Sequence, residues 1–271
     1  MRNIMKLTLS ISPCPNDTFM FDALINKRID TAGFEFDVTF ADIEELNRAA
    51  LSGTPDISKI SYAVYPLVKD NYKILAAGSA LGRGNGPLLV TGDDNADISD
   101  FGMRVAIPGV NTTANLLMNK LYPHISNKHP YLFSDIMDIV ERGECDAGVL
   151  IHEGRFVYHK MGLFLLADLG IEWEERTGLP LPLGAIAIAD RLGAEVKSTV
   201  NSLVRKSVLY ALTHPDDSRE FVRSHAQEMD PQVIGDHIKL FVNDLSKDLG
   251  EEGKKSAEEL LGFSLDGLII R

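Results

Sequence analysis

Three loops in this sequence place polar residues directly after short apolar runs that predict strands. They are SPCPNDT, which begins at Ser12; SKISYAVYP, which contains Lys59, Ile60 and Ser61; and IPGVNTTANL, which contains Thr112 and Thr113. Hydroxyl groups and the unpaired N–H groups at a helix start can bind a carboxylate. Ordinary helix capping explains each loop taken alone. Three loops of one pattern in one chain make a shared ligand site equally plausible.

The first loop predicts a rigid turn that leads into a helix. Prolines at positions 13 and 15 fix the backbone, and Asn16, Asp17 and Thr18 are residue types that cap helices. We therefore expect a helix from about residue 18 to residue 26, with its first turn capped by these side chains.

The residue best suited to catalysis is His152, which directly follows the apolar run AGVLI at residues 147–151. A histidine can act as a general base near neutral pH, and Glu153 or Arg155 could orient it or hold an anion. The alternative is a structural histidine whose ring is satisfied by backbone groups at a strand end. Since the other histidines form no HxxxH pair, we expect no metal site, and we expect no cofactor.

Strands and helices are predicted in alternation over the first two thirds of the chain, and helices follow. Val200, Leu203, Val204, Ser207, Val208 and Ala211 recur at helical spacing and predict one long helix with an apolar face. Alternating strands and helices indicate parallel sheets covered by helices on both sides.

This order of elements favours two α/β lobes. We expect residues 1–90 and 191–271 to form a discontinuous first lobe and residues 91–190 to form the second. A ligand would then bind in the cleft between the lobes, because strand carboxyl ends and helix N-termini would line it.

The composition limits the partners of the protein. A net charge of −12 over 271 residues argues against nucleic acid and against an anionic membrane surface, but an anionic small molecule can still bind a local positive site. The two cysteines, Cys14 and Cys145, form no CxxC pair, so we expect reduced thiols in a cytoplasm. The start of the chain, MRNIMKLTLSIS, lacks the long apolar region of a signal peptide. The oligomeric state is not predictable from the sequence.

Longer stretches of the chain carry a specific resemblance. They are SPCPNDTF, KISYAVYP, GSALGRGNGPLLV, VAIPGVNTTANLL, LIHEGRF and GLFLLADLGIEWEERTGLPLPLGAI. Together they resemble the 1,4-dihydroxy-6-naphthoate synthase family of the futalosine route to menaquinone. The resemblance covers most of the chain and is weaker at residues 122–132 and after Gly262.

The resemblance implies a two-lobed, periplasmic-binding-protein-like (type II) α/β fold with a ligand cleft between the lobes, used as a cytoplasmic enzyme. It implies a carbon–carbon lyase that converts cyclic dehypoxanthine futalosine to 1,4-dihydroxy-6-naphthoate and a three-carbon sugar fragment, dihydroxyacetone. His152 matches the family's proton acceptor. The residues that match its substrate contacts are Lys59, Ile60, Ser61, Thr112 and Thr113.

Two alternative functions remain open from the sequence. A solute-binding protein would have the same architecture without chemistry, and the sister enzyme of the pathway, a chorismate dehydratase, would have the same fold. The segments SPCPNDTF and LIHEGRF favour the naphthoate synthase over the dehydratase. A ligand-sensing regulator is a more distant possibility, because no helix-turn-helix or basic patch is evident.

Overall fold

The computed structural model describes residues 4–226 and 230–271; residues 1–3 of the N-terminal segment and residues 227–229 lie outside the described part. The chain divides into two compact units. Unit 1 comprises the residues up to Leu81 together with Gly184–Arg271, and unit 2 comprises Gly82–Leu183. The chain passes into unit 2 before residue 90 because strand β6 (Leu88–Thr91) already pairs within the second sheet.

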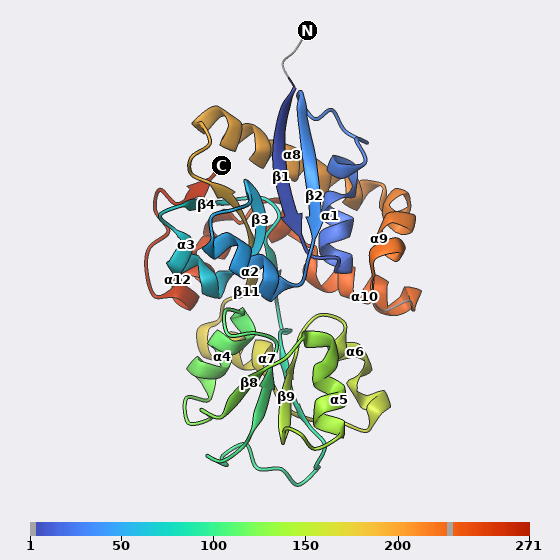
Figure 1. Ribbon diagram of the computed structural model, residues 1–271, viewed down its shortest axis with the longest axis vertical. Coiled ribbons are helices and arrows are strands. Elements are labelled where there is room, and N and C mark those ends of the chain that lie inside the picture. Colours follow the sequence, from blue (N-terminus) through green and yellow to red (C-terminus); the bar gives the residue numbers. More distant parts are fainter. Residues whose placement is uncertain (1–3, 227–229) are drawn as a thin grey trace. The chain divides into compact units, whose positions relative to one another are not determined.

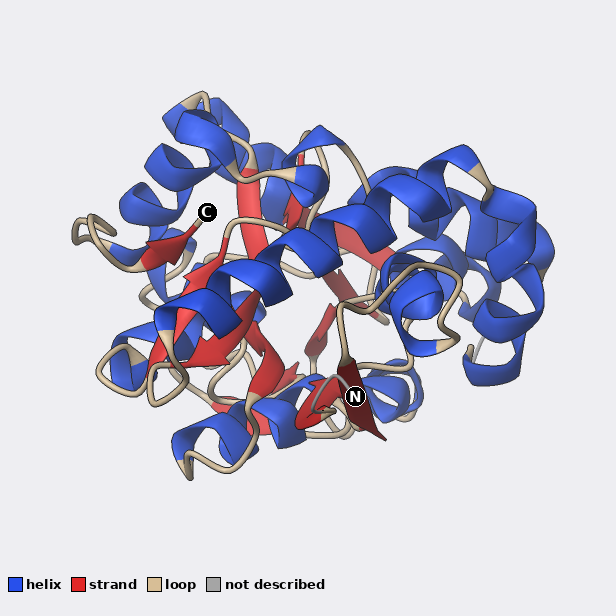
Figure 2. Ribbon diagram, turned by 90° about the horizontal axis from the view of Figure 1, so that it is seen from above, coloured by secondary structure: helices blue, strands red, loops and turns tan. Residues whose placement is uncertain are grey.

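Unit 1 contains a mixed sheet flanked by helices (Figures 1 and 2). Its strands are β1 (Met5–Ile11), β2 (Phe34–Phe40), β3 (Ile57–Ser61), β4 (Tyr72–Leu75), β5 (Ala80–Gly82), β11 (Leu181–Ala189) and β12 (Ile269–Ile270). Its helices are α1 (Pro15–Ile25), α2 (Ile43–Leu51), α3 (Tyr65–Val68), α8 (Ala194–Thr213), α9 (Arg219–His225), α10 (Pro231–Phe241), α11 (Asp244–Lys247) and α12 (Gly250–Leu261).

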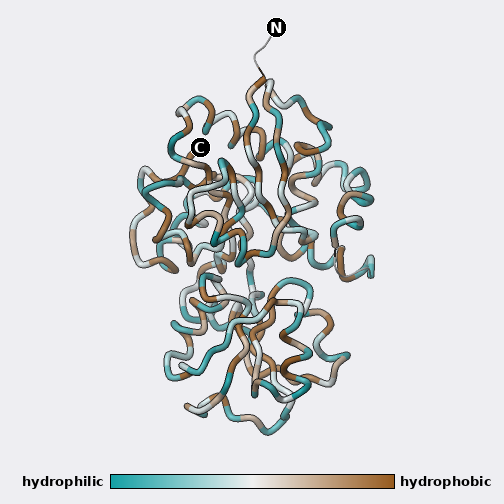
Figure 3. Tube along the Cα trace, in the orientation of Figure 1, coloured by the Kyte–Doolittle hydropathy of each residue, from teal (hydrophilic) through white to brown (hydrophobic). Residues whose placement is uncertain are grey.

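The strand order in this sheet is β12-β4-β11-β3-β1-β2, with β5 beside β11. Strands β1, β2 and β3 are parallel, whereas β11 runs antiparallel to both of its neighbours, β3 and β4. The predicted purely parallel sheet is therefore wrong for this unit, and the sheet is mixed. The reason is that β11 enters from unit 2 and not through a βαβ crossover. Strand β2 lies at the sheet edge, and its tube in Figure 3 alternates between apolar and polar residues.

The core of unit 1 forms where α1 and α8 pack against the central strands. The predicted apolar face of α8 is confirmed, since all six of its predicted residues are buried. Ser207 lies in this face because its hydroxyl donates to the Met20 carbonyl (2.6 Å) and accepts from the Leu24 N–H (3.1 Å). These two bonds satisfy a buried polar group and attach α8 to α1.

Unit 2 contains a second mixed sheet of smaller extent. Its strands are β6, β7 (Val105–Ile107), β8 (Lys128–Pro130), β9 (Ala147–Leu150) and β10 (Phe164–Asp168), in the order β10-β6-β9-β7-β8. Its helices are α4 (Thr113–Leu121), α5 (Ile136–Glu141), α6 (Gly154–Val157) and α7 (Leu169–Thr177). Strands β7, β8 and β9 are parallel, and β6 runs antiparallel between β9 and β10.

Several elements differ from the sequence-based expectation. Strands β8, β10 and β12 and helix α7 were not predicted, because three of these segments are short and α7 carries a mixed, charged sequence. Helix α1 begins at Pro15, three residues before the expected start, since proline fits the first helical position well. Within residues 4–226 and 230–271, no helix combines the length and hydropathy that crossing a membrane requires.

Candidate functional site

The parallel strands of each unit end at one edge of their sheet, which we call the carboxyl edge of that unit. In unit 1, β1 ends at Ile11, β2 at Phe40 and β3 at Ser61. The loop after β1 and the end of β3, two of the three loops predicted to bind a ligand, therefore lie at the same edge.

A buried ion pair joins these two segments. The Lys59 ammonium donates to Asp17 Oδ1 at 2.7 Å, and their side chains are only 6% and 1% exposed. Ser12 Oγ donates to Asp17 Oδ2 (2.7 Å), and Asn16 Nδ2 donates to Oδ1 (2.9 Å). Buried charges are stable when they are paired and fully hydrogen-bonded, and Asp17 meets both conditions.

A glycine on the neighbouring strand makes room for this lysine. Strand β11 pairs with β3 so that Gly184 lies opposite Ser61, and a Cβ atom at Gly184 would be 2.6 Å from Lys59 Cε. The Lys59 side chain therefore lies against the bare backbone of β11, with its ammonium bound to Asp17. A direct contact between Lys59 and a ligand stays a prediction.

The predicted capping of α1 by residues 16–18 is wrong. Cys14 occupies the N-cap position, and no side chain caps the helix. Asp17 lies inside the first turn with its carboxylate bound to Ser12 and Lys59, and Thr18 Oγ1 donates to the Cys14 carbonyl at 3.0 Å. The pairing of Asp17 with Lys59 was missed because nothing local in the sequence relates residues 42 positions apart.

The end of β3 is held by helix α2. Asn47 Oδ1 accepts from the Ser61 N–H at 2.8 Å, and Asn47 Nδ2 donates to Ser61 Oγ at 3.0 Å. Both residues are buried, as is Ile60, whose side chain belongs to the core. The Ser61 hydroxyl is thus fixed in position, and its contact with a ligand, like that of Ile60, stays a prediction.

A carboxyl group that the sequence analysis did not single out lies at the same edge. Asp42 follows β2 and caps α2 by accepting from the Glu44 N–H at 2.8 Å, and the adjacent Ala41 N–H donates to the Ile11 carbonyl at 3.2 Å. Asp42 Oδ2 is buried without a hydrogen-bond partner among the described residues. Burial raises the pKa of Asp42, more than its hydrogen bonds to the first turn of α2 lower it.

The carboxyl edge of unit 2 carries the other predicted residues. Strands β7, β8 and β9 end at Ile107, Pro130 and Leu150. Thr112 and His152 follow two neighbouring strands of this parallel group, since β7 pairs directly with β9. The sheet thus brings the helix-start loop and the histidine to one edge, as the sequence predicts.

Thr112 forms the predicted cap of α4. Its hydroxyl accepts from the Asn115 N–H at 3.3 Å and donates to the Gly109 carbonyl at 2.8 Å. Thr113, the first residue of the helix, donates its hydroxyl to the Leu183 carbonyl at 2.8 Å. Both threonines are buried, and the N-terminal N–H groups of the helix lie beside them.

His152 has a left-handed backbone conformation, which is uncommon for residues other than glycine. Its φ is +54°, in the left-handed region, and it lies in the turn between β9 and α6. Its ring meets the edge of the Phe133 ring, with centroids 4.8 Å apart and an interplanar angle of 73°. Phe133 follows β8, so two segments at the carboxyl edge, one after β8 and one after β9, meet at the imidazole. Left-handed backbone at a non-glycine residue persists only where its surroundings impose it, and it is frequent at functional sites.

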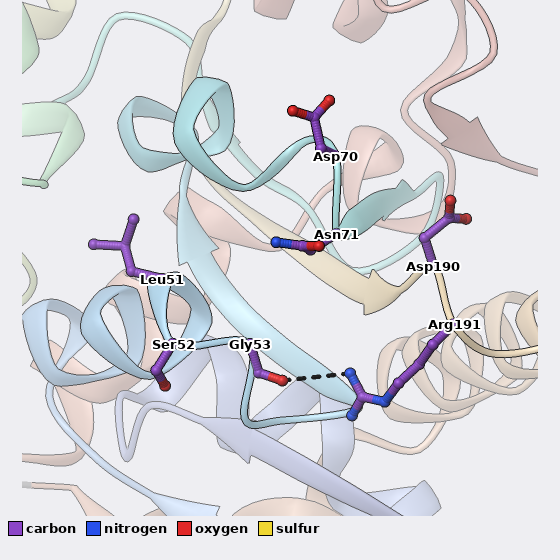
Figure 4. Close-up of a pocket in the computed structure, with 7 residues that line it drawn as sticks. All are labelled: Leu51, Ser52, Gly53, Asp70, Asn71, Asp190 and Arg191. Atoms are coloured by element: carbon purple, nitrogen blue, oxygen red, sulfur yellow. Dashed lines mark hydrogen bonds between the residues drawn. The ribbon is translucent and has the colours of Figure 1, made fainter.

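Neither edge offers an evident metal site, because no group of three or more metal-ligating side chains comes together in the described part of the chain. A hollow of about 520 Å³ in unit 1 lies elsewhere, at the opposite edge of the sheet (Figure 4). Residues that precede β3 and β4 and follow β11 line it, among them Gly53, Asn71 and Arg191. It contains none of the predicted site residues.

Comparison with known proteins identifies the family. A family model described as menaquinone biosynthesis matches residues 7–264. Proteins named 1,4-dihydroxy-6-naphthoate synthase are similar over 94% of the chain: that of Thermus thermophilus is 44% identical over 254 residues, and that of Streptomyces coelicolor is 45% identical over 260. The alignments cover 92% and 91% of those proteins. The chain belongs to the 1,4-dihydroxy-6-naphthoate synthase family. It is therefore an enzyme of menaquinone biosynthesis.

Solved structures confirm the predicted fold class. A crystal structure of a protein from Archaeoglobus fulgidus is 34% identical, with a TM-score of 0.88 over 95% of this chain and 96% of that one. The alkanesulfonate-binding protein SsuA from Xanthomonas axonopodis is similar in fold alone, at 10% identity and a TM-score of 0.72 over 96% and 92% of the two chains. The chain thus has the periplasmic-binding-protein-like fold expected from its sequence.

Proposed function

We propose that this member of the family is a carbon–carbon lyase that converts cyclic dehypoxanthine futalosine to 1,4-dihydroxy-6-naphthoate and dihydroxyacetone, with His152 as general base. The proposal requires an anionic substrate that His152 and the predicted binding residues contact. It also includes a cytoplasmic location, which cell fractionation would test.

The proposed reaction begins with proton removal by a neutral His152. The imidazole accepts a hydroxyl proton from the sugar-derived part of the substrate, and the resulting alkoxide collapses to a carbonyl as the neighbouring carbon–carbon bond breaks in a retro-aldol cleavage. The electron pair of that bond moves onto the conjugated carbonyl of the ring fragment as an enolate, which takes up a proton from the protonated His152. Aromatisation of the second ring supplies much of the driving force. Oriented hydroxyl and N–H donors from Ser61, Thr112 and Thr113 would stabilise the carboxylate or the developing oxyanions.

The observation that carries the proposal is the conformation of His152 at the carboxyl edge of unit 2. Its left-handed φ of +54° and the edge contact with Phe133 fix the ring at the carboxyl edge, where the segment that leads into α4 follows the neighbouring strand β7. A histidine side chain fixed there can act as a general base on a substrate whose carboxylate binds the helix start. An ordinary strand-end histidine needs no such backbone.

The experiment that tests the proposal supplies cyclic dehypoxanthine futalosine to the purified chain and measures both products. We expect naphthoate fluorescence to rise in step with release of the three-carbon fragment. Loss of the base in His152→Asn should lower the turnover number by about 10²–10⁴ while the variant still binds product. A folded His152→Asn variant with near-normal turnover would remove His152 from the mechanism.

Two further incubations separate the proposal from the alternatives. Unchanged cyclic dehypoxanthine futalosine after long incubation with stoichiometric protein would favour a binding protein without catalysis. Turnover of chorismate in place of that substrate would instead favour a chorismate dehydratase. The proposed lyase consumes the first compound and leaves chorismate unchanged.

A further inference from the structure

We infer that Arg155 is a positioning residue for the base. Its side chain attaches the turn that contains His152 to two adjacent segments at the same carboxyl edge, the one before β6 and the end of β10. The inference rests on the proposed role of His152. It assigns Arg155 to holding protein groups in place, and not to binding the substrate carboxylate.

The Arg155 guanidinium binds two protein acceptors in different segments. Nη1 donates to the Gly86 carbonyl at 2.6 Å, and Nη2 donates to Asp168 Oδ2 at 2.8 Å. The side chains of Arg155 and Asp168 are only 15% and 9% exposed. The positive charge is thus compensated within the protein, and the fork geometry of the guanidinium is used for both bonds.

The sheet register shows what this contact spans. Leu88 of β6 pairs with Leu150 of β9 on one side and with Asp168 of β10 on the other. Arg155 belongs to α6, which begins two residues after His152. Its side chain therefore crosses the start of β6 and connects the segment after β9 to the end of β10.

The acceptors of Arg155 are themselves firmly held. Asp168 Oδ1 caps α7 by accepting from the N–H groups of Gly170 (3.0 Å) and Ile171 (3.2 Å). A Cβ atom at Gly170 would lie 2.1 Å from the carbonyl carbon of Asn85, so the start of α7 packs directly on the backbone that leads to Gly86. Arg155 thus fastens α6 to a rigid anchor.

This anchor gives a physical reason for the strained backbone at His152. A non-glycine residue keeps left-handed backbone where the surrounding structure determines the turn. The sheet fixes the strand before His152, through the pairing of β9 with β6 and β7. Arg155 fixes the helix after it. Without this clamp the turn can relax, and the ring would leave the position from which it reaches the substrate.

The kinetic test compares Arg155→Lys with a matched control. Lysine keeps the charge but cannot bind Gly86 and Asp168 as a fork, so we expect kcat to fall roughly 10–100-fold with KM changed less than about 3-fold. The control is Arg83→Lys, because Arg83 forms a more exposed ion pair with Glu174 in the same unit. Its kcat should stay within about 2-fold of the wild-type value.

Two kinetic results would overturn the inference. A rise in KM with unchanged kcat would mean that Arg155 binds substrate, and a smaller folded fraction with unchanged kcat per folded molecule would mean a merely structural role. Should Arg155→Lys fold poorly, Asp168→Asn provides a milder variant. Asparagine keeps the α7 cap but removes the charge, and a smaller fall in kcat at constant KM is expected.

A double-variant cycle separates this inference from the proposed function. If His152→Asn turns over slowly, as proposed, and adding Arg155→Lys lowers that residual rate by less than about 2-fold, the two residues act through one step, as inferred. If the two losses multiply, the positioning role is wrong although the base stands. If His152→Asn alone keeps normal turnover, the base fails, and the positioning role fails with it.

A spectroscopic readout tests the same point without activity. The ring of Phe133 lies edge-on to His152 at 4.8 Å, so the NMR shift of the His152 Cε1–H depends on the orientation of the two rings. The signal is assigned by its absence in His152→Asn. We expect it to move in Arg155→Lys and to stay in place in Arg83→Lys. An unmoved signal in Arg155→Lys would contradict the inference.

Discussion

The buried pair between Lys59 and Asp17 makes a strong prediction about stability. Asp17→Asn keeps the shape of the side chain but leaves the Lys59 ammonium, 6% exposed, without its counter-charge. Breaking a buried ion pair by removing one partner destabilises a protein by about 3–5 kcal/mol. At the 2.7 Å separation of Lys59 Nζ and Asp17 Oδ1, two unit charges attract by about 6 kcal/mol at an effective dielectric constant of 20, which is large enough to account for a net loss in that range.

The assay for this prediction is thermal and urea unfolding followed by far-ultraviolet circular dichroism. For a chain of this size, a loss of about 3–5 kcal/mol corresponds to a fall in Tm of roughly 6–20 °C. The matched control is Glu35→Gln, which breaks the exposed pair with Lys27 in the same unit. That change should alter the free energy of unfolding by less than about 1 kcal/mol.

A second variant tests the reason for the loss. Asp17→Asn combined with Lys59→Met removes both charges, so the combined variant should be more stable than the sum of the two single losses predicts. The reasoning is refuted if Asp17→Asn loses no more stability than Glu35→Gln. It is also refuted if the double variant loses as much free energy of unfolding as the two single variants together, since Lys59 and Asp17 would then not stabilise one another.

Three further predictions concern stability in the two units. Because burial raises the pKa of Asp42, the folded state loses stability as pH rises from the ordinary value of 3.8 through the raised pKa. Asp42→Asn should remove this loss, so the urea midpoint of the variant should fall less than that of the wild type over the same pH range. An unchanged pH dependence in the variant would contradict the prediction. Gly170→Ala should destabilise unit 2 by about 1–3 kcal/mol, measured by Trp173 fluorescence, because the new Cβ would collide with the Asn85 backbone; wild-type stability would count against that packing. Thr112→Ala should lower the free energy of unfolding by about 0.5–2 kcal/mol because it removes the α4 cap, whereas Thr112→Ser keeps a capping hydroxyl and should lower it much less. Equal stability of the two variants would mean that the cap contributes nothing.

The sequence predicts those parts of the fold that depend on local patterns. The apolar face of α8 follows from helical spacing, and the cap of α4 follows from Thr112 in a loop after a strand. The two strands that arrive from the other unit, β6 and β11, run antiparallel, which strand–helix alternation does not indicate. Their direction is set by how the chain passes between the units, a property of the whole topology.

The candidate site is predictable in its residues but not in their partners. The position of His152 after an apolar strand suggests a base, yet its left-handed φ is imposed by the sheet and the segments packed around the turn. Lys59 looks like a ligand contact in the sequence, whereas the fold gives its ammonium to Asp17. Arg155 and Asp168 are joined only because β6 inserts between β9 and β10. Such partners are set by sheet order, which a single sequence does not contain.

The most direct test of the proposed function is a single-turnover reaction of cyclic dehypoxanthine futalosine with the wild-type protein and with His152→Asn. We expect the wild type to form naphthoate and the three-carbon fragment in equal amounts, and the variant to bind the substrate but to form both about 10²–10⁴ times more slowly. Equal rates in the two proteins, or a substrate recovered intact from the wild type, would contradict the account.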